Sequence, residues 1–244
     1  MIARLLGLPV EASAHAAQID TITGLVHLLM LVLFLGWGTF FVYTLIRFRR
    51  ARQPKADYDG VRGHATTWTE AAIVLIELVL LVAFALPAWA TRVNGRPLAN
   101  DALIVRVVAE QFSWNVHYAG PDGEFGRTDM TLAAADNPLG IVPGSPHAAD
   151  DVTTVSELVL PVNRPVIVQL TSKDMIHSFG VPVMRVKQDA IPGMTIPVWF
   201  TPTRVGEYEI ACSQLCGLGH YRMRAILRVV EPDEFTRWLR TQQP

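Results

Sequence analysis

The feature that most constrains this 244-residue chain is a pair of long apolar segments in its N-terminal part. Residues 21–46 contain no Asp, Glu, Lys or Arg, and residues 66–91 contain only Glu70 and Glu77. A helix needs about 20 apolar residues to cross a hydrocarbon core about 30 Å thick, so each segment is long enough. The sequence therefore predicts two transmembrane helices.

The charges around these segments predict how the chain is oriented. The N-terminal tail carries only Arg4, whereas the connector between the segments is strongly basic and contains Arg47, Arg49, Arg50, Arg52, Lys55 and Arg62. Short loops rich in Lys and Arg stay in the cytoplasm. Both ends of the chain are therefore expected outside, which in a bacterium is the periplasm. The expected layout is a tail 1–20, a helical hairpin 21–92 with a cytoplasmic loop, and an outer domain 93–244.

The outer domain is expected to be all-β. After Arg92 the chain becomes rich in Asn, Gly, Pro and Asp, and Pro or Gly stands at nearly every junction between short apolar runs. Many short strands without intervening amphipathic helices indicate a sandwich or barrel. Residues 119–154 lack periodicity and are expected to form a long surface loop, and residues 232–238 a short helix. The predicted strands are 102–109, 158–160, 166–171, 195–200, 207–211 and 224–230.

Soft metal ligands are concentrated in residues 211–223, which contain Cys212, Cys216, His220 and Met223. Thiolate and thioether ligands select copper or zinc over hard cations, and the thioether favours copper. A second thiolate would let both sulfurs bridge two copper ions, which suits an electron relay. The alternative is a local disulfide between the cysteines in an oxidising compartment, with the other side chains incidental. A further histidine must come from elsewhere, and His177, just after a predicted strand, is the best candidate.

Several further motifs accompany this loop: the aromatic strip 111–118, the His-Ser-Phe sequence at 177–179, and the Lys-Gln-Asp-Ala-Ile-Pro-Gly sequence at 187–193. Together with the two spans and the Cys-x-x-x-Cys-x-x-x-His-x-x-Met loop, they resemble subunit II of cytochrome c oxidase over nearly the whole chain. The resemblance implies a membrane-anchored all-β protein. Its expected fold is a two-helix transmembrane hairpin followed by a cupredoxin-like Greek-key β-barrel that carries the dinuclear copper centre CuA.

The resemblance also implies a ligand set. Cys212 and Cys216 would bridge the two coppers, His177 and His220 would each bind one of them, Met223 would be a weak ligand, and the backbone carbonyl of Gln214 would complete the site. Quinol-oxidising relatives lack these ligands, so their presence implies a c-type cytochrome as donor.

By the same resemblance, the chain would accept electrons from cytochrome c and pass them to haem in subunit I. There oxygen would be reduced and protons pumped, so the chain would be an enzyme subunit without bond-making chemistry of its own. Subunit III and the membrane of the bacterial cell are further expected partners. The net charge of −1 offers no strong field for nucleic acid.

Three departures from the family pattern affect particular residues. Many relatives have glutamate at the position of Gln214, and because an amide is a poorer ligand for a hard cation, magnesium at the subunit interface is doubtful. The aromatic strip has Phe112 where the family has tryptophan, so either Phe112 or Trp114 would receive the electron, or both pack the barrel. Ala65 replaces the family's acid near the proton-channel mouth, which leaves Glu77 for a proton path or a hydrogen bond to subunit I.

Other functions share parts of this pattern. The copper subunit of a nitric oxide reductase would have every feature above. A membrane-tethered copper chaperone or storage protein would bind one exchangeable copper and would need no donor surface. A degenerate subunit of a quinol oxidase is opposed by the intact ligand set.

Overall fold

The computed structural model describes residues 5–56, 58 and 63–243. The chain divides into two compact units. The first contains residues 18–95 together with residues up to Leu8, and the second contains residues 9–17 and 96–244. The chain therefore leaves the second unit after a short N-terminal segment, forms the first unit, and returns.

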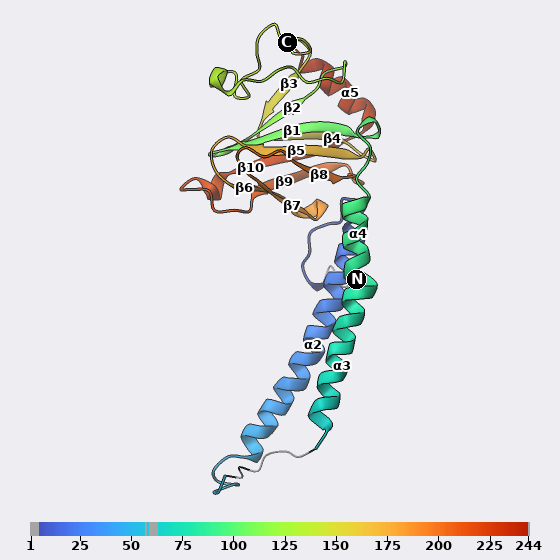
Figure 1. Ribbon diagram of the computed structural model, residues 1–244, viewed down its shortest axis with the longest axis vertical. Helices are drawn as coiled ribbons and strands as arrows, with labels where there is room; N and C mark the ends of the chain where they lie inside the picture. The colour runs from blue at the N-terminus through green and yellow to red at the C-terminus, as the bar shows by residue number, and fades with distance from the viewer. Residues whose placement is uncertain (1–4, 57, 59–62, 244) are drawn as a thin grey trace. The chain divides into compact units, whose positions relative to one another are not determined.

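The first unit is the helical hairpin expected from the sequence (Figure 1). Helix α2 covers Ala16–Arg47 and begins five residues before the predicted span. The second span is a continuous run of α3 (Ala65–Leu80), the single π-helical turn η1 (Leu81–Ala85) and α4 (Leu86–Asn94). The π turn lies just before Pro87, which has no N–H to donate and crowds the carbonyl four residues earlier, so the hydrogen-bond pattern shifts there.

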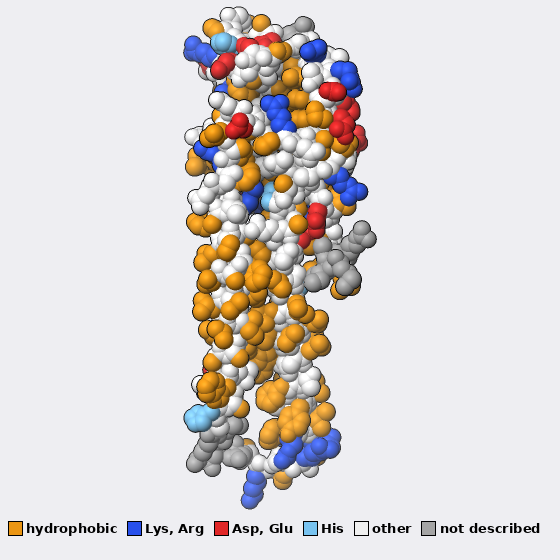
Figure 2. Space-filling view, turned by 90° about the vertical axis from the view of Figure 1, so that its right-hand side faces the viewer, with side chains coloured by type: hydrophobic (Ala, Val, Ile, Leu, Met, Phe, Trp, Pro, Cys, Tyr) orange, Lys and Arg blue, Asp and Glu red, His pale blue; other side chains and the backbone are white. Residues whose placement is uncertain are grey.

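Both helices are long and apolar enough to cross a membrane. Most of their side chains are exposed, and Figure 2 shows hydrophobic side chains along the helical part with Lys and Arg gathered at one end. An isolated water-soluble hairpin would not expose so much apolar surface. The prediction of two membrane helices is thus supported by the exposed side chains as well as by composition.

The second unit is a sandwich of two five-stranded sheets (Figure 1). One sheet has the order β3-β2-β1-β5-β8 and the other β4-β10-β9-β6-β7. Neighbours are antiparallel except for two parallel pairs, β1 with β5 and β4 with β10. The strands are β1 (Leu103–Glu110), β2 (Ser113–Tyr118), β3 (Val152–Val155), β4 (Glu157–Pro161), β5 (Val166–Ser172), β6 (His177–Val181), β7 (Val186–Ala190), β8 (Ile196–Phe200), β9 (Gly206–Cys212) and β10 (Arg224–Val230).

Alternation along the strands places one hydrophobic core between the sheets. In β1, Val105, Val107 and Ala109 are buried, whereas Arg106 and the other residues between them face the opposite side. The all-β prediction is confirmed, and all six predicted strands are present. Four strands were not predicted: β2, β3, β6 and β7.

An N-terminal segment, residues 9–17, is part of this second unit. Its backbone bonds three residues of the sandwich: Ala12 N donates to Val183 O (3.0 Å), Ala14 N to Thr201 O (3.0 Å), and Thr203 N to Ala12 O (2.9 Å). Ala12 and Ala16 are fully buried. The segment is therefore packed on the sandwich instead of forming a free tail.

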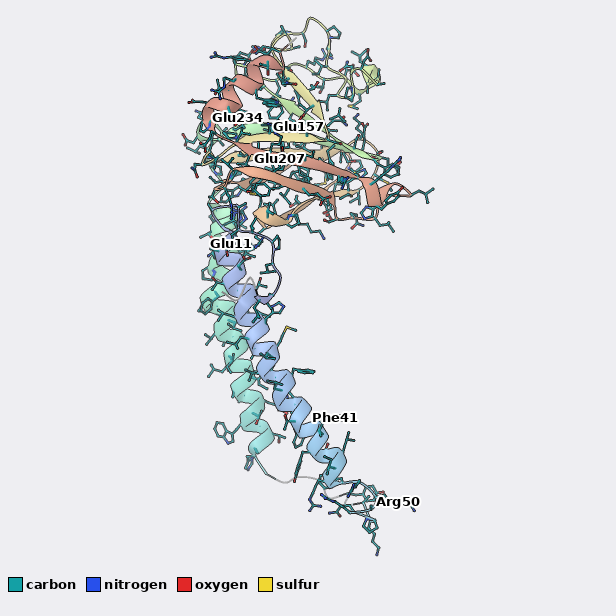
Figure 3. The ribbon with its side chains drawn as sticks, turned by 180° about the vertical axis from the view of Figure 1, so that it is seen from behind. Glu11, Phe41, Arg50, Glu157, Glu207 and Glu234 are labelled. Carbon is teal, nitrogen blue, oxygen red and sulfur yellow. The ribbon has the colours of Figure 1, made fainter. Side chains whose placement is uncertain are left out.

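The C-terminal helix α5 (Pro232–Thr241) is three residues longer than predicted and is bound to the sandwich by an ion-pair network. The guanidinium of Arg228 in β10 lies 3.1 Å from Glu157, 3.7 Å from Glu207 and 3.6 Å from Glu234. Figure 3 shows these three glutamates close together on β4, β9 and α5. One arginine thus joins three elements.

The long segment between β2 and β3 (residues 119–151), called here the covering loop, is irregular, as expected, but is tied down. Backbone hydrogen bonds join Asp129 N to Gly140 O (2.7 Å) and Val142 N to Arg127 O (2.8 Å). At its end, Asp151 bonds to His117 in β2 and to the backbone of Gly126. The covering loop therefore forms a fixed layer over the outer face of the β1 sheet.

Candidate metal centre

Two loops at one end of the sandwich bring the predicted ligands together (Figure 1). Residues 173–176 connect β5 to β6, so that His177 begins β6 instead of directly following a strand. The other loop follows β9 and carries the remaining ligands. Because β6 and β9 are antiparallel neighbours with Phe179 opposite Cys212, the first histidine and the first cysteine lie side by side.

The sulfurs of Cys212 and Cys216 lie at the centre of the cluster, 3.7 Å apart. Cys212 Sγ is 4.0 Å from Nδ1 of His177, and Cys216 Sγ is 3.6 Å from Nδ1 of His220 and 3.7 Å from Sδ of Met223. Each sulfur therefore has a histidine nitrogen next to it. The structure brings together all the side chains expected as ligands.

The two cysteines are free thiols. Their sulfur separation is far greater than the roughly 2.05 Å of a disulfide bond. Burial, followed by the nearby Cys212 thiol, raises the pKa of Cys216 to about 11. At neutral pH without metal, the Cys216 thiol therefore keeps its proton, and metal binding must displace it.

The residue Asp174 orients His177, a role that the sequence did not reveal. Its Oδ1 lies 2.8 Å from Nε2 of His177, and its other carboxylate oxygen accepts from Gln111 N at 2.7 Å. Burial acts to raise the pKa of Asp174, but hydrogen bonds from His177, Gln111 and Met175 outweigh it and lower the pKa. With Nε2 occupied by the carboxylate, Nδ1 is the nitrogen left to face the sulfurs.

A second positioning contact comes from the side chain of Gln111. Its Nε2 donates to the backbone carbonyl of Cys216 at 2.8 Å and lies 3.1 Å from Sδ of Met175. Gln111 therefore connects the end of β1 to both loops of the cluster. In the sequence it appears only as the first residue of an aromatic strip, which gives no sign of this role.

The two candidate electron acceptors differ sharply in their surroundings. Trp114 is fully buried, and its ring lies 6.4 Å from that of His177 and 5.6 Å from that of Phe179. Phe112 is partly buried and packs over the ligand loop, where a Cβ on Gly219 would come within 2.3 Å of its ring. Phe112 is therefore partly exposed and in contact with the ligand loop, whereas Trp114 is buried beside His177.

Two other predicted residues have less defined surroundings. The backbone carbonyl of Gln214 lies 3.1 Å from Sγ of Cys212, and its side chain is exposed. Glu77 lies in α3 with an exposed side chain. Next to the cluster, large apolar side chains are strongly exposed on the ligand loop: Leu215 by 76%, Leu218 by 99% and Tyr221 by 85%.

The donor set fits copper. Two thiols, two imidazoles and a thioether are all soft or borderline ligands, and none of the side chains that converge on the sulfurs is a carboxylate. Four of the five are buried, and His220 is partly buried. Calcium and magnesium prefer oxygen ligands, which this cluster supplies only through the Gln214 carbonyl.

The chain is similar in sequence to a known protein family. Residues 103–230 match the family model described as cytochrome c oxidase subunit II, periplasmic domain. The alternative cytochrome c oxidase subunit 2 of Bradyrhizobium diazoefficiens is 32% identical over 205 residues, which cover 84% of this chain and 73% of that protein. Cytochrome c oxidase subunit 2 of Cereibacter sphaeroides is 29% identical, covering 96% and 78%.

Among solved structures, the periplasmic domain of subunit II of cytochrome oxidase from Bradyrhizobium japonicum is 32% identical, covers 60% of this chain and 96% of that chain, and has a TM-score of 0.44. The family model spans more than half of the chain, and the identity to the first relative extends through most of it. The chain therefore belongs to the cytochrome c oxidase subunit II family.

Proposed function

We propose that this chain is the electron-accepting subunit of a haem–copper terminal oxidase, and that it receives electrons from a c-type cytochrome at a dinuclear CuA centre. The observation that carries the proposal is a pair of buried free thiols whose sulfurs are surrounded by two imidazoles and a thioether. A mononuclear zinc site would use the two thiols and two imidazoles and leave the thioether without a role, whereas a mononuclear blue-copper site would leave one thiol without a role. The shared thiols favour two metal ions.

The arrangement divides the ligands into two halves. Cys212 has His177 and the Gln214 carbonyl beside it, and Cys216 has His220 and Met223. When bound, the copper pair supplies one-electron redox chemistry. The protein holds the ligands from strand ends and buries the sulfurs, so that the site changes little in geometry when its charge changes.

We propose different roles for Phe112 and Trp114. Phe112 is partly exposed and packs against the ligand loop at Gly219, so we assign the point at which electrons enter to this ring. The guanidinium of Arg222 lies 5.7 Å from the ring centroid and limits its movement. Trp114 is a core residue that supports His177 from below.

The surface around the ligand loop favours a donor that docks mainly through apolar contacts. Leu215, Leu218 and Tyr221 are largely exposed there. Of the three acids near the cluster that could attract a basic donor, Glu110, Asp174 and Asp189, two are already engaged: Glu110 pairs with Lys173 at 2.6 Å, and Asp174 bonds to His177. Charged pairs mainly accelerate encounter, so association should depend only weakly on salt.

The remaining assignments follow from the family and the membrane helices. The β unit would lie in the periplasm on the inner membrane of a bacterium, next to subunits I and III, and electrons would pass to haem in subunit I for oxygen reduction coupled to proton pumping. A carboxyl in hydrocarbon is costly, so Glu77 would face a partner helix or water and serve either a proton path or a contact with subunit I. Gln214 makes magnesium at that interface doubtful.

Electron paramagnetic resonance of the copper-loaded full chain in detergent tests the central proposal. The full chain is used because residues 9–17 belong to the β unit. Hyperfine splitting from one electron shared equally by two coppers is the expected result. A single-copper spectrum, or a silent Cu(I) site, would instead indicate a chaperone and refute the relay.

Two serine substitutions in the same loop make the test specific. Cys216→Ser should abolish the shared-electron spectrum because it removes a bridging sulfur. Leu218→Ser is the matched control: its side chain is 99% exposed, so the spectrum should be unchanged, while electron transfer from the donor cytochrome should slow. A normal spectrum in Cys216→Ser contradicts the ligand assignment. Unchanged donor kinetics in Leu218→Ser contradict the docking surface alone.

A further inference from the structure

A polar cavity lies between the outer face of the β1 sheet and the covering loop, apart from the copper ligands. Its volume is about 560 Å³, within the usual range for small-molecule sites. The strands contribute Arg106, His117, Gln169 and Thr171, among others, and the covering loop contributes Thr128, Met130 and Leu139. The cavity is therefore formed by both layers.

The chemistry of the cavity wall favours an anion. Arg106 and Lys173 line it, together with four hydroxyl side chains, and no described residue among those that line it is acidic. Lys173 is already paired with Glu110, which lies outside the lining, at 2.6 Å. Arg106 is therefore the cation with most capacity for a new partner.

The side chain of Arg106 is held in place on two sides. Its guanidinium carbon lies 4.0 Å from the ring centroid of Phe125, and its Nε donates to Oε1 of Gln169 at 3.2 Å. Phe125 in turn packs edge-on against His117, with 4.9 Å between ring centroids. A guanidinium fixed in this way loses little conformational freedom when it binds a ligand.

The terminal nitrogens of Arg106 are not used. A guanidinium has five N–H donors, and of these only the Nε–H has an acceptor in the described part of the chain. The carboxylate whose charge acts on Arg106 is that of Asp151. Its Oδ2 accepts from His117 Nε2 at 2.7 Å and from Gly126 N at 2.9 Å, its Oδ1 is buried without a hydrogen-bond partner, and no ion pair joins it to Arg106 among the described residues. The planar fork of Arg106 therefore remains available, and this fork matches carboxylate and phosphate oxygens.

We propose that this cavity binds a small organic oxyanion, with its carboxylate or phosphate group on the Nη atoms of Arg106. Thr128, Thr171 and Thr195 also line the cavity, and their hydroxyls supply further hydrogen-bond donors. The apolar side chains on the wall, Val108 and Leu139 among them, suit the carbon skeleton of such a ligand.

The test is a titration of the full chain in detergent with inorganic phosphate and, separately, with succinate, at ionic strength held constant with sodium chloride. The readout is the unfolding temperature, which rises with ligand concentration when only the folded state binds. A saturable rise with phosphate assigns a phosphate group, and a saturable rise with succinate assigns a carboxylate. Failure of both anions to produce saturation overturns the proposal.

Three variants locate the binding. Arg106→Lys keeps the charge but removes the planar fork, and should weaken binding by about tenfold. Thr195 is exposed at the cavity wall, so Thr195→Glu should fold normally. Its added negative charge should lower the affinity for the anion by at least about tenfold. In Thr195→Gln, which adds no charge, the affinity should stay within about twofold of that of the unmodified protein. Unchanged affinity in either Arg106→Lys or Thr195→Glu refutes the site.

Discussion

The contact between Gly219 and Phe112 can be tested by adding a single methyl group. Gly219 has φ of −92°, which any residue can adopt, so Gly219→Ala adds a Cβ without backbone strain. That Cβ would lie 2.3 Å from Cδ2 of Phe112, whereas ordinary contacts begin near 3.4 Å, so the ring must move by at least 1.1 Å, the difference between the two. Overpacking of this kind costs about 1–3 kcal/mol.

For a unit of this size, the cost corresponds to a fall of roughly 2–12 °C in unfolding temperature. The assay is thermal unfolding of the copper-free full chain in detergent, followed by tryptophan fluorescence. The control is the same substitution in a Phe112→Ala background, where the obstacle is gone and the added methyl group should cost less than about 0.5 kcal/mol. An equal cost in both backgrounds would show that Phe112 does not pack on Gly219, and the electron pathway through this ring would have to be abandoned.

Three further predictions concern polar side chains of the β unit. Tyr118→Phe removes a hydroxyl that donates to Val159 O (3.2 Å) and accepts from Val159 N (2.7 Å), and should destabilise the β unit by about 2–4 kcal/mol in urea unfolding; a loss below about 0.5 kcal/mol would contradict this. Burial lowers the pKa of His117, which therefore stays neutral in the folded state while the unfolded chain takes up a proton, so that stability should fall as the pH drops below about 6.5. His117→Gln should flatten that pH dependence, and an unchanged slope would mean that another group is responsible. Asp174→Ala should lower copper affinity 10–100-fold in a competition titration because His177 loses its orienting carboxylate, whereas an affinity within twofold would assign Asp174 to the surface only.

The parts of the fold that could be predicted are those set by local composition. The spans are visible because a membrane helix must be apolar along its whole length, whatever it packs against. Their ends were less visible: α2 extends to Ala16 because nothing in residues 16–20 breaks a helix, although Asp20 interrupts the apolar run. A charged residue such as Asp20 ends the apolar segment, but the helix itself can continue beyond it.

The strands that were missed are stabilised by their neighbours. Strand β7 reads Val-Lys-Gln-Asp-Ala, which has little strand propensity, and it forms because its backbone pairs with β6 over five residues. Strand β6 in turn begins at a ligand, His177, in a stretch that looks like a loop. Whether such a segment forms a strand depends on its pairing with a neighbouring strand, and this pairing cannot be read from a single sequence.

The same contrast applies to the site. The candidate ligands could be predicted because four of them lie in one short loop and the fifth is one histidine. The role of Asp174 was not, because an acid near a copper site is equally compatible with attracting a donor, and only the 2.8 Å contact with His177 distinguishes the two roles. The choice between Phe112 and Trp114 likewise depends on burial: Trp114 is in β2 and points into the core, whereas Phe112 precedes the strand.

The alternation of side chains in β1 predicts correctly which residues face away from the core, but it does not predict what covers them. Alternation in β1 places Arg106 on the face opposite the core, and alternation alone predicts that this face meets solvent. Instead, the covering loop lies over it, anchored by contacts such as that of Asp151 with His117, 34 positions away in sequence. Covering a polar face leaves hydrogen-bonding groups that water no longer reaches freely, and each must find a partner or remain unsatisfied. Oδ1 of Asp151 is one such buried atom without a partner, whereas the Nη atoms of Arg106 stay accessible in the cavity and can bind a ligand there.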